Sequence, residues 1–552
     1  MRSALGSMSV EDERRRLRFT IIATILGSIV VFLDATVVNV ALPVISDDLG
    51  TGLADQQWVV EAYLLALVAL LLVGGSLGDQ FGRRRIFIIG LGLFGVTSIL
   101  CGIAPSSGVL IASRGLQGLA GALLVPGSLA ILAATFEGAE RGKAVGTWTA
   151  WTGIATVIGP AGGGALIEAL SWRAIFLVNV PLILVTMWIA HRCVRESVDP
   201  EADRHIDWLG ILMSAVGLGL PVFALIQQPT HGWGDPMVFG SLIAGIAIFA
   251  LFIVWESRYP HAILDLSLFK VRNFAVTNIE TLVVYAGLFG AFFFITLFLQ
   301  QTAGYSPIGA GLATTPVSVV MFVLSPRFGK MSTGIGPRVP MSIGPVIGGI
   351  GLLLLMRVGA DPDPNYLTEV LPALLVFGVG LSATVAPLTA TALNSVEERH
   401  VGIASGINNG VSRVAGLLAI AILGALIAGK FTSTIDSNLA GKQLSPQAEQ
   451  SVNDAKEKPL GAADTADLAA VEASTVDDAV SDASTQSFHL GVAVGGVLMI
   501  IGGVIAGIGL RNPSREIEYD APGAATAGEC AHCPDHLDGT PRRQPEPVAG
   551  ST

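Results

Sequence analysis

One stretch of sequence decides the fold: Gly74-Gly75-Ser76-Leu77-Gly78-Asp79-Gln80-Phe81-Gly82-Arg83-Arg84-Arg85, which lies between two long apolar segments. Glycines at this spacing permit a tight turn and a close approach of helices. Three consecutive arginines beside a membrane span mark its cytoplasmic side. Asp79 is placed to hold an arginine or to cap a helix. The stretch is therefore predicted to be a short cytoplasmic loop between two transmembrane helices.

The composition is that of a protein with many membrane spans. Of the 552 residues, 51% are hydrophobic and 14% are charged, whereas soluble proteins carry about 25% charged residues. Uncharged apolar segments of about 20 residues, the length that crosses a bilayer as a helix, recur along nearly the whole chain. The first of them is too long for a cleaved signal peptide and leads directly into the next. The chain is predicted to be an all-α polytopic membrane protein.

Fourteen spans are predicted, and their loops set the orientation. The spans lie at about 19–42, 56–78, 86–104, 107–135, 143–168, 172–190, 207–228, 236–256, 273–300, 308–329, 337–357, 366–393, 402–429 and 487–510. Arginines and lysines gather before the first span and in the short loops after the even-numbered spans. The positive-inside rule assigns those loops, and both termini, to the cytoplasm. The expected location is the cytoplasmic membrane.

Most of the formal net charge of -11 lies in two segments outside the spans. Residues 431–486 carry three lysines against ten acidic residues, and residues 511–552 carry four arginines against seven. The first segment is expected outside the cytoplasm, with at most weak helix and substantial mobility, and the second as a disordered cytoplasmic tail. The helical body is nearly neutral and offers no basic surface for nucleic acid.

Three more patterns accompany the opening stretch. They are Leu33-Asp34-Ala35-Thr36-Val37-Val38-Asn39-Val40-Ala41-Leu42-Pro43 at the end of the first span, Leu110-Ile111-Ala112-Ser113-Arg114-Gly115-Leu116-Gln117-Gly118 in the fourth, and Gly159-Pro160-Ala161-Gly162-Gly163-Gly164 in the fifth. Together the four patterns resemble the fourteen-span drug/proton antiporter branch of the major facilitator superfamily, over about residues 19–429 and the final span. The resemblance implies a multidrug efflux transporter with two six-helix bundles and two inserted spans, which is no enzyme and needs no cofactor besides a proton gradient.

A second stretch, partly similar to the opening one, supports the prediction that the chain has two related halves. It reads Arg327-Phe328-Gly329-Lys330-Met331-Ser332-Thr333-Gly334-Ile335-Gly336-Pro337-Arg338. When Gly336 is aligned with Gly82, Thr333 takes the place of Asp79, so the basic character remains and the acid is lost. The predicted divisions are an amino-terminal segment (1–18), a first bundle (19–190), a linker with two spans (191–272), a second bundle (273–510, including 431–486) and a tail (511–552).

Asp34 and Arg114 are the strongest candidates for proton coupling or substrate contact. A charged side chain inside a span costs about 2.5–3.5 kcal/mol and usually faces a cavity or a partner. At about 1.5 Å per residue, Asp34 lies about 13 Å and Arg114 roughly 10 Å below the same surface, so the two are expected at one level. The resemblance links the matching arginine to proton transfer. A structural hydrogen bond or a helix-packing ion pair is the alternative for each.

Two further acids lie within spans. Glu61 stands near the outer end of the second span, where the family pattern usually has a small polar residue. It is either an interfacial carboxylate that reaches water or a second acid for cationic substrates or protons. Glu280 lies about seven residues into the ninth span and is expected to face a cavity. Glu168 and Arg413 remain candidates for helix packing.

The antiporter motif and the opening stretch are assigned to switching. Gly159-Pro160 is predicted to kink the fifth helix, and Gly163 and Gly164 to let a neighbouring helix approach. This is the seam that governs leak and the direction of opening, and an ordinary proline kink is the alternative. The gating loop is predicted to act as a cytoplasmic latch, not as a substrate site. Its residues are Gly75, Asp79, Gly82, Arg83 and Arg84.

Metal binding is not expected. Cys530 and Cys533 form a C-x-x-C pattern beside two histidines, and thiolates and imidazoles are zinc ligands. A structural site normally also needs a folded partner segment, and none follows.

The sequence predicts a proton-coupled antiporter that exports amphipathic, cationic or neutral organic compounds. Its partners are the small-molecule substrate, protons and the lipid bilayer, and it is expected to work as a monomer. The alternatives are an exporter of an endogenous lipid or secondary metabolite, a membrane receptor that transports nothing, and a facilitator independent of protons.

Overall fold

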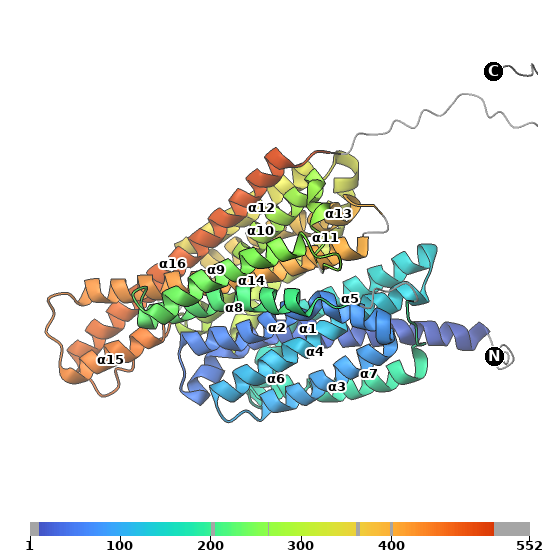
Figure 1. Ribbon diagram of the computed structural model, residues 1–552. Helices are drawn as coiled ribbons and strands as arrows, with labels where there is room; N and C mark the ends of the chain where they lie inside the picture. The colour runs from blue at the N-terminus through green and yellow to red at the C-terminus, as the bar shows by residue number, and fades with distance from the viewer. Residues whose placement is uncertain (1–9, 200–204, 263, 360–364, 398–400, 513–552) are drawn as a thin grey trace, which may run out of the picture. The chain divides into compact units, whose positions relative to one another are not determined.

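The chain is all helical over the residues that the computed structural model describes, which are 10–199, 205–262, 264–359, 365–397 and 401–512 (Figure 1). The α-helices are α1 (Val10–Leu49), α2 (Leu53–Phe81), α3 (Arg83–Gly102), α4 (Ser107–Thr135), α5 (Gly138–Ala169), the short α6 (Ala174–Leu177) continued by α7 (Asn179–Cys193), α8 (Trp208–His231), α9 (Pro236–Glu256), α10 (Arg272–Gln301), α11 (Pro307–Ile335), α12 (Arg338–Leu354), α13 (Leu371–Asn394), α14 (Val401–Leu439), α15 (Pro446–Glu457) and α16 (Ala470–Gly509). Short turns lie at Leu266–Lys270, Leu355–Arg357 and Tyr366–Val370. Fourteen helices in these ranges are long and apolar enough to cross a membrane, which confirms the predicted fold class.

Helices α1 to α7, the first half, pack through small residues. Helices α2 and α4 lie side by side, as do α3 and α4, and α1 with α5 and α7. Gly118 on α4 lies against the main-chain carbonyl of Tyr63 on α2, and Gly74 lies against that of Ala122. Because lipid supplies no hydrophobic drive between helices, such close backbone contact is what holds membrane helices together.

Helices α10 to α14 and α16, the second half, also pack through close backbone contacts at glycines. Helix α16 packs on α10, α12 and α14, and α13 packs on α11 and α12. A Cβ on Gly287 of α10 would lie 2.6 Å from the carbonyl oxygen of Gly495 on α16, and one on Gly496 would lie 2.8 Å from that of Gly349 on α12. Only glycine permits these approaches without a shift of the backbone.

Helices α8 and α9, the inserted pair, lie outside both halves. Helix α8 packs on α9 and also on α2 and α14, one helix from each half. The rings of Trp58 on α2 and Phe223 on α8 are 6.3 Å apart. Asp207 caps α8 by accepting a 2.8 Å hydrogen bond from the Gly210 amide, and it accepts another of 2.8 Å from Trp255 at the end of α9. The inserted pair therefore flanks the seam between α2 and α14.

The segment 431–486 is mostly helical, so the expectation of at most weak helix is wrong, whereas its expected mobility stays a prediction. It comprises the end of α14, α15 and the start of α16, and we call it the cap. The cap has an apolar core of its own: Phe431, Ile435, Ala448, Val452, Ala455, Val476, Val480 and Ala483. Asn438 donates a 2.8 Å hydrogen bond to Asp482, and Lys456 lies 2.6 Å from Asp436. Apolar residues at helical spacing form this core, and the overall composition of the segment does not reveal that spacing.

The remaining sequence expectations on organisation stay predictions. These are the domain divisions, the cytoplasmic position of both termini and the extracytoplasmic position of the cap. Nearly all of the predicted tail lies outside the described residues, and Cys530 and Cys533 with it.

Candidate functional site

Asp34 and Arg114 form an ion pair inside the first half. The Arg114 Nη1 lies 2.5 Å from Asp34 Oδ2, and both side chains are buried. Arg114 Nε also donates to the main-chain carbonyl of Val59 on α2 at 3.1 Å. The guanidinium lies over the ring of Tyr63, with Cζ 4.2 Å from the ring centroid. The arginine is thus held by α1 and α2 while it projects from α4.

The other carboxylate oxygen of Asp34 is bound by two side-chain amides, one from α4 and one from α7. Gln117 Nε2 donates to Asp34 Oδ1 at 3.1 Å, and Asn179 Nδ2 donates to the same oxygen at 3.4 Å. Gln117 also accepts from Arg114 at 2.6 Å and donates to Ser98 on α3 at 3.0 Å. Buried charges are stable only when their remaining hydrogen-bonding groups are satisfied, and this network satisfies both oxygens of Asp34.

Sequence reasoning missed Ser98, Asn179 and Tyr63 as members of the network. Nothing in the sequence spacing of Asn179 or Tyr63 indicates contact with Asp34. Ser98 lies on α3 beside Thr97 in a mainly apolar stretch, where a small hydroxyl side chain gives no signal of function.

Glu61 and Glu280 are both fully buried. Glu61 therefore does not reach water from the interface, and Glu280 does not face an open cavity in this conformation. Neither carboxylate has a hydrogen-bond partner for either oxygen within the described residues. Beside Glu280, Asn408 on α14 donates to Asn278 at 3.2 Å and to Thr281 at 2.8 Å. The two acids differ in this respect from Asp34, whose charge is compensated.

The antiporter motif forms the contact between α5 and α11. A Cβ on Gly164 would lie 2.6 Å from the Cα atom of Ile308, and Gly311 on α11 lies against the carbonyl of Pro160. Glu168 accepts a 2.9 Å hydrogen bond from the amide of Ile308. On its other face the motif packs on α1, where Gly159 contacts Thr36 and Gly163 contacts Val37. The glycines thus line a close contact between the two halves.

The gating loop is bound by the chain that follows α7. Asp79 accepts a 2.7 Å bond from Arg83, and Gly82 turns the chain with φ +107°, which favours glycine. The carboxylate of Glu196 accepts from the amides of Arg84 and Arg85 at 3.0 and 3.2 Å. Sequence reasoning missed Glu196, because its position in space depends on where α7 ends.

Gly75, the remaining residue of the predicted gating loop, lies within α2. A Cβ added to it would meet Pro126 of α4 at 3.7 Å, an ordinary contact. Asp79 also lies within α2, which continues to Phe81, and α3 begins at Arg83, so Gly82 alone links the two helices.

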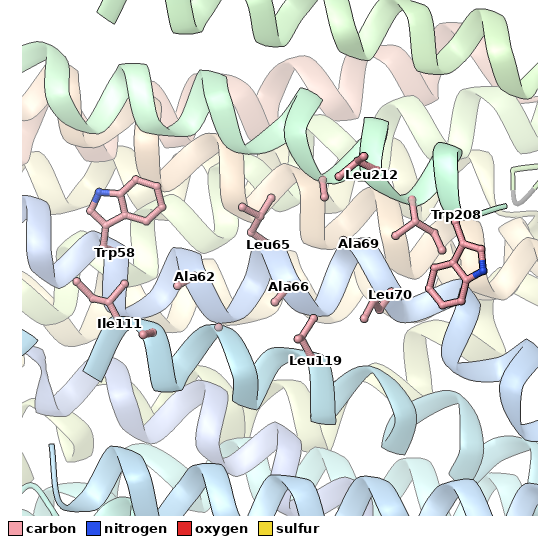
Figure 2. Close-up of a pocket in the computed structure, with 14 residues that line it drawn as sticks. Trp58, Ala62, Leu65, Ala66, Ala69, Leu70, Ile111, Leu119, Trp208 and Leu212 are labelled. Carbon is pink, nitrogen blue, oxygen red and sulfur yellow. The ribbon is translucent and has the colours of Figure 1, made fainter. Parts of the chain in front are cut away.

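An apolar cavity of about 660 Å³ lies between α2, α4 and α8. Trp58 and Trp208 stand at its two ends, and Ala62, Leu65 and Ala69 lie between them (Figure 2). None of the charged residues described above lines it. The described residues contain no cluster of histidine, cysteine and acidic side chains that would hold a metal ion.

Comparison with known proteins agrees with this architecture. Residues 24–420 match the model of the Major Facilitator Superfamily. The multidrug resistance protein Stp of Mycobacterium tuberculosis is 35% identical over 76% of this chain and 78% of its own length. The tetracenomycin C resistance and export protein of Streptomyces glaucescens is 30% identical over 88% of this chain and 90% of its own. In fold, a bacterial homologue of the lysosomal transporter Spinster is similar, with a TM-score of 0.62 at 14% identity, covering 90% of this chain and 99% of that one.

These matches span most of the chain and of each relative, and the relatives are resistance and efflux proteins. The chain therefore belongs to the major facilitator superfamily.

Proposed function

We propose that this protein is a proton-coupled antiporter that exports amphipathic, cationic or neutral organic compounds across the cytoplasmic membrane. The observation that carries the proposal is the buried ion pair between Asp34 and Arg114, joined by 2.5 Å in the middle of the first half. Intramembrane ion pairs of this kind mark substrate and proton paths. The relatives named above are resistance and export proteins, which supports export as the direction.

Asp34 has the properties of a proton switch. Protonation removes its charge and leaves Arg114 without a counterion, and breaking a buried pair in this way costs about 3–5 kcal/mol. Arg114 keeps its hydrogen bond to the Val59 carbonyl on α2. The interaction that is weakened is therefore the one between α4 and α1. Proton binding at Asp34 thus changes how α1 packs against α2 and α4. A change of that size is enough to bias two conformations of the protein.

Glu61 and Glu280 would carry protons in this conformation, in which Asp34 is ionised and paired with Arg114. A buried carboxyl group without a partner is stable only with a proton bound, because an unpaired charge in an apolar interior is strongly unfavourable. Each therefore represents a protonated acid in this conformation, and it would lose its proton when the conformation changes and water or a cationic substrate reaches it. Glu61 lies on α2 and Glu280 on α10, so each half contributes one such acid.

Switching would occur by rocking of the two halves about the seam. The contact between Gly164 and Ile308 supports a hinge or seal between α5 and α11. The gating loop with Asp79 and Arg83 would stabilise the cytoplasmic end of one state. In this proposal both termini are cytoplasmic, the cap is outside and a single chain is the working unit.

The test uses the full chain in proteoliposomes with an imposed pH gradient and a fluorescent amphipathic cation. We expect export to require the gradient, to stop when an ionophore collapses it, and to move protons in the opposite direction, as read by a pH-sensitive dye. Asp34→Asn should abolish proton-driven export while leaving the protein folded. Export that persists unchanged in Asp34→Asn, or after the gradient has collapsed, contradicts proton coupling. The proposal of export fails if no compound in a panel of amphipathic drugs, lipids and metabolites is transported.

A further inference from the structure

A second intramembrane arginine, Arg413, lies at the seam between the two halves. It belongs to α14 and is half-buried. Its Cζ lies 5.8 Å from the centroid of the Phe32 ring on α1. The phenols of Tyr63 on α2 and Tyr285 on α10 are the ionisable groups that act on its charge. The guanidinium of Arg413 therefore lies near one aromatic ring of the first half, and one phenol of each half lies within electrostatic range of it.

Arg413 differs from Arg114 in having no counterion. Arg114 lies 2.5 Å from Asp34, whereas Arg413 forms no ion pair with any described residue. Phe32, at 5.8 Å, offers only a cation–π contact near the limit of its range. A guanidinium has five donors and no acceptor, and intramembrane arginines are normally paired. The charge of Arg413 is thus available to a negatively charged group other than the described residues.

The hydroxyl of Tyr63, which acts electrostatically on Arg413, is a second hydrogen-bond donor without a partner. The side chain is 2% exposed, and its hydroxyl is buried without a hydrogen-bond partner. Its ring is occupied by Arg114, 4.2 Å away, so the hydroxyl is the free part. A phenol hydroxyl and a guanidinium both donate to anionic oxygen, and such charge-assisted bonds are about twice as strong as neutral ones.

Neither Asp34 nor Glu61 acts as the counterion of Arg413 in this conformation. The two oxygens of Asp34 are bound by Arg114, Gln117 and Asn179. Glu61 lies on the same helix as Tyr63, two residues earlier, and side chains at that spacing do not share a helix face. Both oxygens of Glu61 also lack a partner, so Glu61 does not bind Arg413.

We propose that Arg413 and the hydroxyl of Tyr63 bind an anionic oxygen of the transported compound, a carboxylate or an ionised phenol on an aromatic framework. In this proposal the aromatic part of the compound lies against Phe32 and Tyr285. This inference rests on the proposed export function and extends its substrate class to amphiphiles that carry an acidic group, zwitterions included.

The test compares a rhodamine with a free carboxylate and its methyl ester, which share one cationic aromatic framework. Export of each dye is measured in proteoliposomes under an imposed pH gradient, with the full chain and with Arg413→Gln, Arg413→Lys and Tyr63→Phe. Arg357→Gln is the matched control, since Arg357 is exposed. We expect Arg413→Gln to lower export of the free acid about tenfold and of the ester less than about twofold. Arg413→Lys should keep only part of the selectivity for the free acid. The ammonium retains the positive charge but cannot form a bidentate contact with a carboxylate. Tyr63→Phe should show a smaller loss for the acid.

Ester export reports that each variant is folded and inserted. An equal loss for both dyes assigns Arg413 to packing and overturns the inference. If Arg413→Gln has no effect on the acid once Glu61→Gln is present, the partner of Arg413 is Glu61 in another conformation, and the inference is again wrong. A wild-type protein that exports the ester but not the acid contradicts this inference alone. A wild-type protein that moves neither dye nor any compound of the wider panel contradicts the proposed function, and the inference falls with it.

Discussion

Thr302, at the end of α10, donates a 2.8 Å hydrogen bond to the main-chain carbonyl of Leu460 in the cap. The Leu460 side chain is fully buried, and its backbone is held at φ +69°. Next to it, a Cβ on Gly52, in the turn between α1 and α2, would lie 2.5 Å from the carbonyl oxygen of Glu457. The end of α15 thus contacts both halves at one end of the seam. We therefore expect the cap to close that end of the seam.

Leu460→Asp is therefore expected to open this end of the seam. A carboxylate at a fully buried apolar position costs at least about 1–3 kcal/mol, which the contacts of the cap must offset. The measurement is labelling of Thr302→Cys by a membrane-impermeant thiol reagent, which should become faster. Val471→Asp is the control, because Val471 also belongs to the cap and is 78% exposed. Equal labelling in the two backgrounds would show that Leu460 does not seal the seam.

Gly164→Ala should destabilise the contact between α5 and α11. The added methyl group would lie 2.6 Å from main-chain atoms of Ile308, and overpacking of this kind typically costs about 1–3 kcal/mol. Gly162→Ala is the matched control, since its methyl group would meet only Ile158, at 3.6 Å. Alanine favours a helix over glycine by up to about 1 kcal/mol, so the control should unfold at the same or a higher temperature. Melting in detergent and export rate are measured, and similar behaviour of the two variants contradicts a seam at Gly164.

Arg114→Gln should destabilise the protein strongly by leaving Asp34 charged and unpaired. The expected cost is about 3–5 kcal/mol, as found when one partner of a buried ion pair is removed. In the double variant with Asp34→Asn the charge is gone, so much of the stability should return. Thermal unfolding of the single and double variants measures the coupling between the two residues. Export should be absent in every member of the set, and additive losses of stability would mean that the pair is not coupled.

Glu196→Gln should loosen the gating loop without abolishing the fold. Glutamine retains one acceptor oxygen where the carboxylate accepts from the amides of Arg84 and Arg85. The loss is about 1 kcal/mol, so hydrogen exchange of these two amides should accelerate about fivefold. Glu137→Gln, at an exposed helix start without a side-chain cap, is the control. Unchanged exchange at Arg84 and Arg85 would show that Glu196 does not hold the loop.

Much of the site could be predicted because membrane helices leave few choices. Asp34 and Arg114 were expected at one level from their distances along two spans, and in the structure they touch. Glu61 and Glu280 were recognised as intramembrane acids, but their burial depends on which helix covers them. Ser98 and Glu196 could not be found from the sequence, because their importance comes only from partners 19 and about 112 residues away.

The number of spans, the membrane environment and the family could all be predicted from the sequence. The length of an apolar segment and the order of short motifs are local properties, which can be read without knowing any tertiary contact. The tertiary structure alone decided what each charged side chain meets. It pairs Arg114 with Asp34 and gives Arg413 no counterion among the described residues, although both are arginines within apolar helices. It also folds the acidic segment 431–486 into a cap that contacts both halves. These pairings and contacts depend on how helices distant in sequence pack together, and no local pattern encodes that.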